Sequence, residues 1–121
     1  MQIAVENRKN PRYAIRLSAE VAYNGKVFTA VTRDLSIGGL CLETDRLLPE
    51  GQALQMGLFL VVDDVEDANT PVLEMRGKVA WAAAGDEGRP STMGIRFEAL
   101  SASQMAGLNR LLKLIPAASA A

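Results

Sequence analysis

The stretch Asp34-Leu35-Ser36-Ile37-Gly38-Gly39-Leu40 decides how this chain is organised. A run rich in β-branched residues, 27–32, leads into it, and the apolar residues 40–42 follow it. This context predicts a break between two β-strands, where side chains leave the sheet and can face a ligand. Asp and Ser side chains also bond the local backbone, so the pattern by itself is compatible with a simple turn. Gly38 and Gly39 tolerate positive φ and let another molecule approach the backbone closely.

The sequence on both sides of this stretch predicts a mainly β fold. Short segments rich in apolar and β-branched residues are separated by turn signals, of which Asn24-Gly25 is a typical two-residue hairpin. Six such segments with short connections favour a six-stranded antiparallel β-barrel or a sandwich, since closure removes exposed sheet edges. An acidic loop is expected over residues 63–71. The expected strands cover residues 17–23, 26–33, 40–44, 53–62, 72–83 and 91–97.

The end of the chain predicts a C-terminal α-helix that covers an open end or face of the barrel. Ser101 and Gln104 have the spacing of a capping box. Apolar residues then recur at helical spacing as far as Pro116, which stops the helix. These apolar positions are Met105, Leu108, Leu111, Leu112 and Ile115. The chain is thus expected to divide into a flexible basic N-terminal loop (1–16), a barrel with its helix (17–116) and a frayed tail (117–121).

Length and composition indicate one soluble, globular domain of the cytoplasm. The chain has 121 residues, of which 49% are apolar and 22% charged, and no apolar run approaches the length of a membrane span. The first residues lack the pattern of a signal peptide. Cys41 is the single cysteine, which fits a reducing compartment, and its leucine neighbours favour a buried small hydrophobe over a reactive thiol. The apolar helix face leaves both a monomer and a homodimer open.

The residues that most enzymes need are missing from this sequence. It contains no histidine, which removes the usual base for a serine or cysteine nucleophile and the commonest metal ligand. Ser36 lacks the Gly-x-Ser-x-Gly context of a nucleophile elbow. The acidic loop lacks the ligand pattern of a calcium-binding EF-hand, and there is no phosphate loop or dinucleotide fingerprint. We therefore expect no catalysis, no metal and no cofactor.

The charge distribution favours the binding of a small anion. The 13 basic and 14 acidic residues nearly cancel, which argues against a general nucleic-acid binder. Arg8 and Arg12 nevertheless concentrate positive charge in a segment where Pro11 disfavours a helix. Two arginines near a terminus are commonly plain solvated charge. Guanidinium groups also bind phosphates and guanine edges, and a carboxylate such as Asp34 accepts from guanine N1–H and N2–H₂. Together with Ser36, these groups predict a pocket for an anionic ligand that carries guanine.

The two motifs together resemble the signature of the PilZ domain, a bacterial receptor for cyclic di-GMP. The first is Arg8-x-x-x-Arg12 and the second is Asp34-x-Ser36-x-x-Gly39. The resemblance extends over roughly residues 6–115, in the expected order. Further similar segments are Pro11-Arg12-Tyr13, Gly38-Gly39-Leu40, Gly77-Lys78-Val79-Ala80-Trp81 and Met93-Gly94-Ile95-Arg96-Phe97.

The resemblance implies a fold and a role for each motif residue. The implied fold is a PilZ-like split barrel of six antiparallel strands with a C-terminal helix. Arg8 and Arg12 would contact the phosphates and guanine edges, Asp34 and Ser36 would hold a guanine, and Gly39 would keep the corner compact. Asn7 stands where the family often has another arginine, which leaves open one or two bound ligands. Additional candidate contacts are Lys9, Asn10, Gly38 and Trp81, although Trp81 fits the barrel core better.

Three functional hypotheses follow from these residues. The first is a receptor that changes conformation on binding cyclic di-GMP and signals to an unidentified protein partner, with an output in motility, biofilm or exopolysaccharide formation. The second is a PilZ-like adaptor that acts by protein–protein interaction without the nucleotide. The third is single-strand nucleic-acid binding on a small barrel, against which the low aromatic content counts. The complete set of motif residues favours the receptor.

Overall fold

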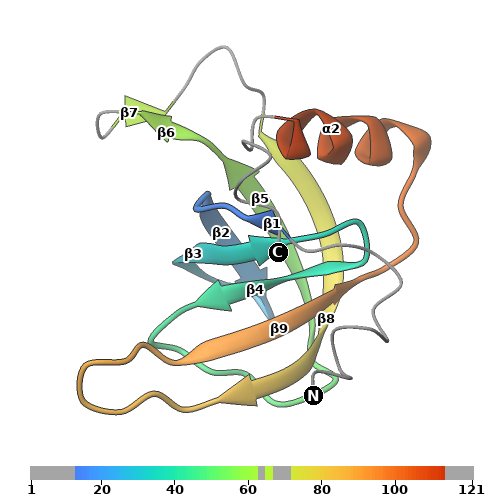
Figure 1. The fold of residues 1–121 in the computed structure, drawn as a ribbon. Coiled ribbons are helices and arrows are strands. Elements are labelled where there is room, and N and C mark those ends of the chain that lie inside the picture. The colour runs from blue at the N-terminus through green and yellow to red at the C-terminus, as the bar shows by residue number, and fades with distance from the viewer. Residues whose placement is uncertain (1–12, 63–64, 67–71, 114–121) are drawn as a thin grey trace, which may run out of the picture.

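The computed structural model describes residues 13–62, 65–66 and 72–113, and its centre is a closed antiparallel barrel (Figure 1). The barrel strands are β2 (Ser18–Tyr23), β3 (Lys26–Leu35), β4 (Gly39–Glu43), β5 (Ala53–Phe59), β8 (Leu73–Ala83) and β9 (Thr92–Phe97). They follow one another in the order β3-β2-β5-β8-β9-β4, and the pairing of β4 with β3 completes the closure. The prediction of a six-stranded antiparallel barrel is confirmed.

Side chains of alternate residues fill the barrel, as the period of two in the sequence predicts. In β5, Leu54, Met56 and Leu58 are buried, whereas Ala53 and Gln55 between and before them are exposed. The predicted hairpin between β2 and β3 is also present, because Asn24 and Gly25 adopt the positive φ values of 47° and 77° that such a turn requires. The fully buried large side chains include Leu17, Leu35, Leu40, Leu42, Leu58, Met75, Met93 and Leu108.

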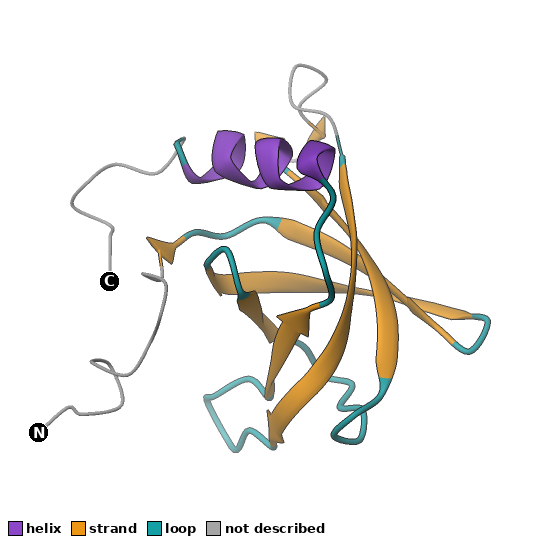
Figure 2. Ribbon diagram, turned by 90° about the vertical axis from the view of Figure 1, so that its right-hand side faces the viewer, coloured by secondary structure: helices purple, strands orange, loops and turns teal. Residues whose placement is uncertain are grey.

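Helix α2 (Ala102–Leu112) lies across one end of the barrel (Figure 2). The predicted capping box is present: the Ser101 hydroxyl accepts from the Gln104 N–H at 3.1 Å, and the Gln104 side chain accepts from the Ser101 N–H at 2.8 Å. Leu108 and Leu111 are buried. The helix packs closely on β8, since a Cβ at Gly107 would lie 2.8 Å from Leu73 Cδ1. Ile115, Pro116 and the tail lie outside the described residues.

The expected strand over residues 53–62 is interrupted, so that prediction was wrong. Strand β5 ends at Phe59, and β6 (Val61–Val62) pairs with β7 (Val65–Glu66) in a separate two-stranded sheet. The last barrel partners of β5 are Ser18 and Leu73, opposite Phe59 and Leu58. Beyond these residues the backbone leaves the barrel. The pairing of β6 with β7 then supplies the hydrogen bonds that the barrel strands no longer provide. The expected acidic loop therefore contains a strand.

The prediction of a loop over residues 1–16 was also wrong near the end of this range, where a short strand is present. Tyr13–Ala14 forms strand β1, which pairs with Leu35 and Asp34 of β3. Strand β2 covers β3 only as far as Val31, so β1 occupies the edge of β3 that β2 leaves open. Residues 1–12 lie outside the described residues.

Thr32 in β3 forms hydrogen bonds with the segment that connects β1 to β2. Its hydroxyl accepts from the Leu17 N–H at 2.7 Å and donates to the Ile15 carbonyl at 2.6 Å. The Thr32 N–H donates to the Leu17 carbonyl at 2.8 Å. Thr32 and Leu17 are fully buried, so water cannot replace the hydroxyl as partner of the Leu17 N–H. The hydroxyl thereby substitutes for ladder hydrogen bonds at the point where the chain passes from β1 to β2.

We predict that Thr32→Val destabilises the protein by about 1–3 kcal/mol, because it leaves the Leu17 N–H and the Ile15 carbonyl without their partner. The free energy of unfolding in urea measures the effect. Thr29→Val, on the exposed side of the same strand, is the matched control and should change stability little. Equal stabilities of the two variants would contradict this account of Thr32.

Candidate functional site

Strand β1, which directly follows the first motif in the chain, pairs with β3 beside the corner that carries the second motif. Tyr13, which follows Arg12 in the chain, pairs with Leu35, and Leu35 directly precedes Ser36. Arg8 and Arg12, and with them Lys9 and Asn10, lie outside the described residues. The pairing of β1 therefore joins the first motif to the second through a residue adjacent to each.

Ser36 closes the corner between β3 and β4. Its N–H donates to the Gly39 carbonyl at 2.8 Å. Its hydroxyl accepts from the N–H groups of Gly38 and Gly39 at 3.2 and 3.3 Å, and donates to the Gly39 carbonyl at 3.2 Å. Ser36 is 4% exposed, so the hydroxyl serves the backbone of the turn in this structure. The interpretation of the motif as a turn is thus supported for Ser36, and a ligand contact of its hydroxyl stays a prediction.

The two glycines attach this corner to β9. A Cβ at Gly39 would collide with the Ile95 carbonyl oxygen and would lie 3.3 Å from Arg96 Cα. The Gly38 carbonyl accepts from the Phe97 N–H at 3.0 Å. Gly39 is therefore required by the close approach of two strands, which agrees with its expected role of keeping the corner compact. Gly38 is exposed at the surface of the corner.

Asp34 stands in a row of residues that crosses the outside of the barrel. It pairs with Ala14 of β1 on one side and with Cys41 of β4 on the other. Cys41 pairs with Gly94 of β9, and Gly94 pairs with Trp81 of β8. Directly paired residues share a face of a sheet, and neighbouring strands lie about 4.8 Å apart. Asp34 and Trp81 therefore lie at the two ends of one row on the outer surface, roughly 14 Å apart along it. Asp34 is half-buried.

Trp81 lies on the outside of the barrel, so its expected place in the core was wrong. It is 45% exposed, and its indole rests on Gly94, where a Cβ would collide with Nε1. By simple alternation Trp81 would share the inner face with the buried Val79. The pairing of β8 with β9 shifts register between Val79 and Trp81, and this bulge turns the indole outward.

Two cations that the sequence reasoning did not single out lie in the next outer row. Gly39 pairs with Arg96 of β9, and Arg96 pairs with Lys78 of β8. Both side chains are exposed. The sequence contained a signal for Lys78 and Arg96, since each alternates with buried residues in a segment that resembles the PilZ pattern. A single cation in a strand is, however, usually interpreted as ordinary surface charge.

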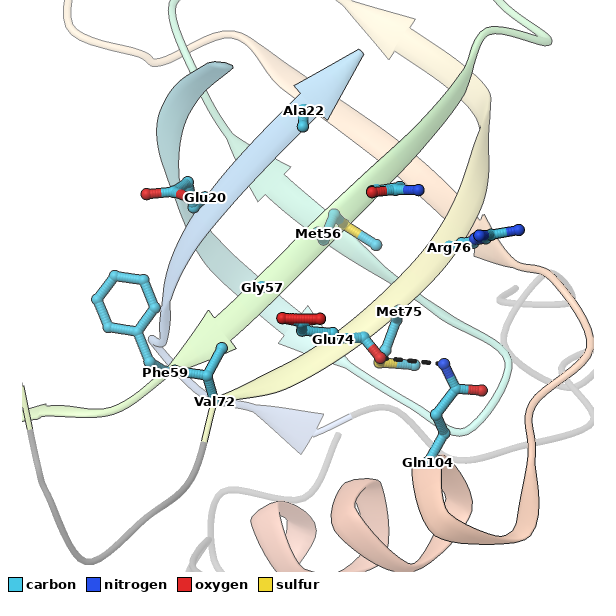
Figure 3. Close-up of a pocket in the computed structure, with 11 residues that line it drawn as sticks. Glu20, Ala22, Met56, Gly57, Phe59, Val72, Glu74, Met75, Arg76 and Gln104 are labelled. Carbon is cyan, nitrogen blue, oxygen red and sulfur yellow. Dashed lines mark hydrogen bonds between the residues drawn. The ribbon is translucent and has the colours of Figure 1, made fainter. Parts of the chain in front are cut away.

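Two hollows in the surface differ in their relation to this corner. One of about 400 Å³ adjoins it and is lined by Tyr13, Ile37 and the end of α2 at Asn109, Leu112 and Lys113. Another of about 500 Å³ lies over β5, which in the strand order is three places from β4 in both directions (Figure 3).

The groove over β5 is poorly suited to an anion. Glu20 and Glu74 flank Gly57 in register, and the backbone carbonyl of Glu74 accepts from the Gln104 amide at 3.0 Å (Figure 3). Among the described residues that line it, Arg76 is the one cation. Two carboxylates beside a bound phosphate would repel it. The corner between β3 and β4 is therefore the better candidate for the anionic ligand.

The described residues contain neither a cluster of metal ligands nor a membrane-spanning helix. No group of three or more Asp, Glu or Cys side chains in this part of the chain is arranged to hold a metal ion. No helix among residues 13–62, 65–66 and 72–113 is long and apolar enough to cross a membrane.

Comparison with known proteins relates most of the chain to one family. The sequence matches the PilZ domain over residues 6–114. No curated protein sequence matches it.

Solved structures of similar fold share little sequence with this chain. The PilZ domain of YcgR from Escherichia coli, solved with c-di-GMP, has a TM-score of 0.72 at 15% identity, with 90% of this chain and 91% of that chain covered. The inhibitor of motility MotI/DgrA from Bacillus subtilis has a TM-score of 0.67 at 16% identity, covering 88% of this chain. The MrkH–c-di-GMP complex from K. pneumonia has a TM-score of 0.69 at 17% identity, also covering 88%. This chain spans about half the length of those last two, 52% and 50%.

We predict that Gly39→Ala lowers the free energy of unfolding by about 1–3 kcal/mol, because its methyl group would push β4 away from the backbone of β9. Urea unfolding measures the loss. Gly57→Ala is the control: its Cβ would lie 3.2 Å from Cγ1 of Val72, a side chain that is 44% exposed and free to shift. A Gly39→Ala protein as stable as Gly57→Ala would refute the tight contact.

Proposed function

Because the chain belongs to the PilZ domain family, we propose that it is a receptor that binds cyclic di-GMP at the corner between β3 and β4. The observation that carries the proposal is the pairing of β1 with β3 beside Asp34 and Ser36. It joins the residue after Arg12 to the strand that ends in the second motif. This pairing supports the assignment of both motifs to one site, although Arg12 and Asp34 are 22 residues apart in the numbering.

The chemistry proposed for each residue follows from its donors and acceptors. Arg8 and Arg12 bind phosphate oxygens and guanine O6 and N7 through their guanidinium forks. The Asp34 carboxylate accepts from guanine N1–H and N2–H₂. Trp81 offers an exposed ring face at the other end of the same outer row, suited to contact with a flat base. Gly39 holds the shape of the corner, and the Ser36 hydroxyl, which bonds the backbone of the turn, is also a proposed contact to the guanine.

The proposed signal is a change of conformation that a protein partner reads. Cyclic di-GMP would bridge the basic segment before Tyr13 and the outer face of β3 and β4, and so select one arrangement of that segment. Structural relatives include an inhibitor of motility and a transcription regulatory factor, so an output of this kind, in motility, biofilm or exopolysaccharide control, is proposed here. We further propose that the protein acts in the cytoplasm and catalyses no reaction.

Calorimetric titration tests the proposal, with GMP and cyclic di-AMP as control ligands. We predict saturable heat with cyclic di-GMP alone and a Kd raised about tenfold to two-hundredfold by Arg12→Ala, which removes a bidentate contact worth about 1–3 kcal/mol. The titration also gives the stoichiometry. Wild-type affinity in a folded Arg12→Ala protein would exclude Arg12 from the site. No heat with the wild type, and an unchanged melting temperature at high ligand, would favour the nucleotide-independent adaptor.

A further inference from the structure

Two like charges face one another on the outside of the barrel. Lys78 of β8 pairs directly with Arg96 of β9, and both side chains are exposed. Neither makes a hydrogen bond or ion pair with another side chain of the described residues. Like charges in directly opposed positions of a sheet destabilise it. The repulsion between Lys78 and Arg96 therefore lowers the stability of the folded protein, and a bound anion would relieve it.

The pair lies beside the corner, on the side away from β1. Strand β1 adjoins β3, and β9 adjoins β4, so the β3–β4 corner stands between them. Arg96 is directly opposite Gly39, where no side chain separates the guanidinium from the backbone of the corner. The Phe97 N–H, one residue on, donates to the Gly38 carbonyl at 3.0 Å and fixes this strand against the corner.

The first motif joins the fold on the other side of the same corner. Arg12 precedes Tyr13, whose partner Leu35 is adjacent to Ser36. Arginines of the first motif and the Lys78–Arg96 pair are thus attached to strands on opposite sides of Gly38 and Gly39. A cyclic dinucleotide carries two phosphodiesters on opposite sides of its ring. The Lys78–Arg96 pair offers positive charge on the side of the corner away from β1, where the second phosphodiester would lie.

We infer that Lys78 and Arg96 form a second anion subsite, which binds the phosphodiester of cyclic di-GMP furthest from β1. The inference rests on the proposed function and adds a contact from β8 and β9 to it. Arg96 supplies a planar fork that matches two phosphate oxygens, and Lys78 supplies a point charge beside it. The phosphate in turn neutralises the repulsion between the two side chains.

Single neutral variants test the subsite by calorimetry and thermal melting. Arg96→Gln and Lys78→Gln should each weaken cyclic di-GMP binding about tenfold, with a smaller dependence of affinity on salt. Arg96→Lys should retain an intermediate affinity, because it keeps the charge without the fork. In the absence of ligand, both Gln variants should melt at or above the wild-type temperature, since each removes the repulsion. A purely structural role would lower the melting temperature instead.

Lys26→Gln provides the matched control for charge. Lys26 is exposed at the opposite end of β3, about 25 Å of extended strand from Asp34. Binding by the wild type that Asp34→Ala weakens, with Arg96→Gln and Lys78→Gln no weaker than Lys26→Gln, would overturn the subsite and leave the receptor standing. No binding of cyclic di-GMP by the wild type would overturn both.

Discussion

The close approach of β4 to β9 at Gly39 is the constraint on which the rest of this structure depends. It is possible because the residue has no Cβ to meet the Ile95 carbonyl. Strand β4 in turn pairs with β3 and closes the barrel, and the Ser36 hydroxyl holds the connection between them. The residues that shape the corner are thus also those that close the fold. Ser36 and Gly39 of the second motif thus have structural roles in addition to the ligand-binding roles proposed for the motif.

The proposed site follows from that closure, because the barrel wall carries its residues in register. Asp34 and Trp81 are separated along the sequence but share one row of paired positions across the outer surface. Small residues, Cys41 and Gly94, occupy the row between them. The strand pairing thus places a carboxylate and an aromatic ring on one outer face of the barrel, and β1 pairs with β3 at the Asp34 end of this row.

Local patterns in the sequence predicted the strands, the first hairpin and the helix cap, since each depends on neighbours in the chain. The outward position of Trp81 was not predictable in this way, because a bulge reverses the alternation after Val79 and a bulge depends on the partner strand. The same holds for the pairing of β1 with β3, which depends on how far β2 extends along that edge. The opposition of Lys78 and Arg96 likewise requires the register of two strands.

Nuclear magnetic resonance titration with cyclic di-GMP tests the central claim most directly, because it maps the site residue by residue. We expect the largest shifts in the backbone amides of residues 34–39 and 94–96 and in the indole N–H of Trp81. Residues over β5, such as Glu20, Gly57 and Glu74, should shift little. Shifts concentrated in that groove, or no shifts at saturating ligand, would contradict a cyclic di-GMP site at the corner between β3 and β4.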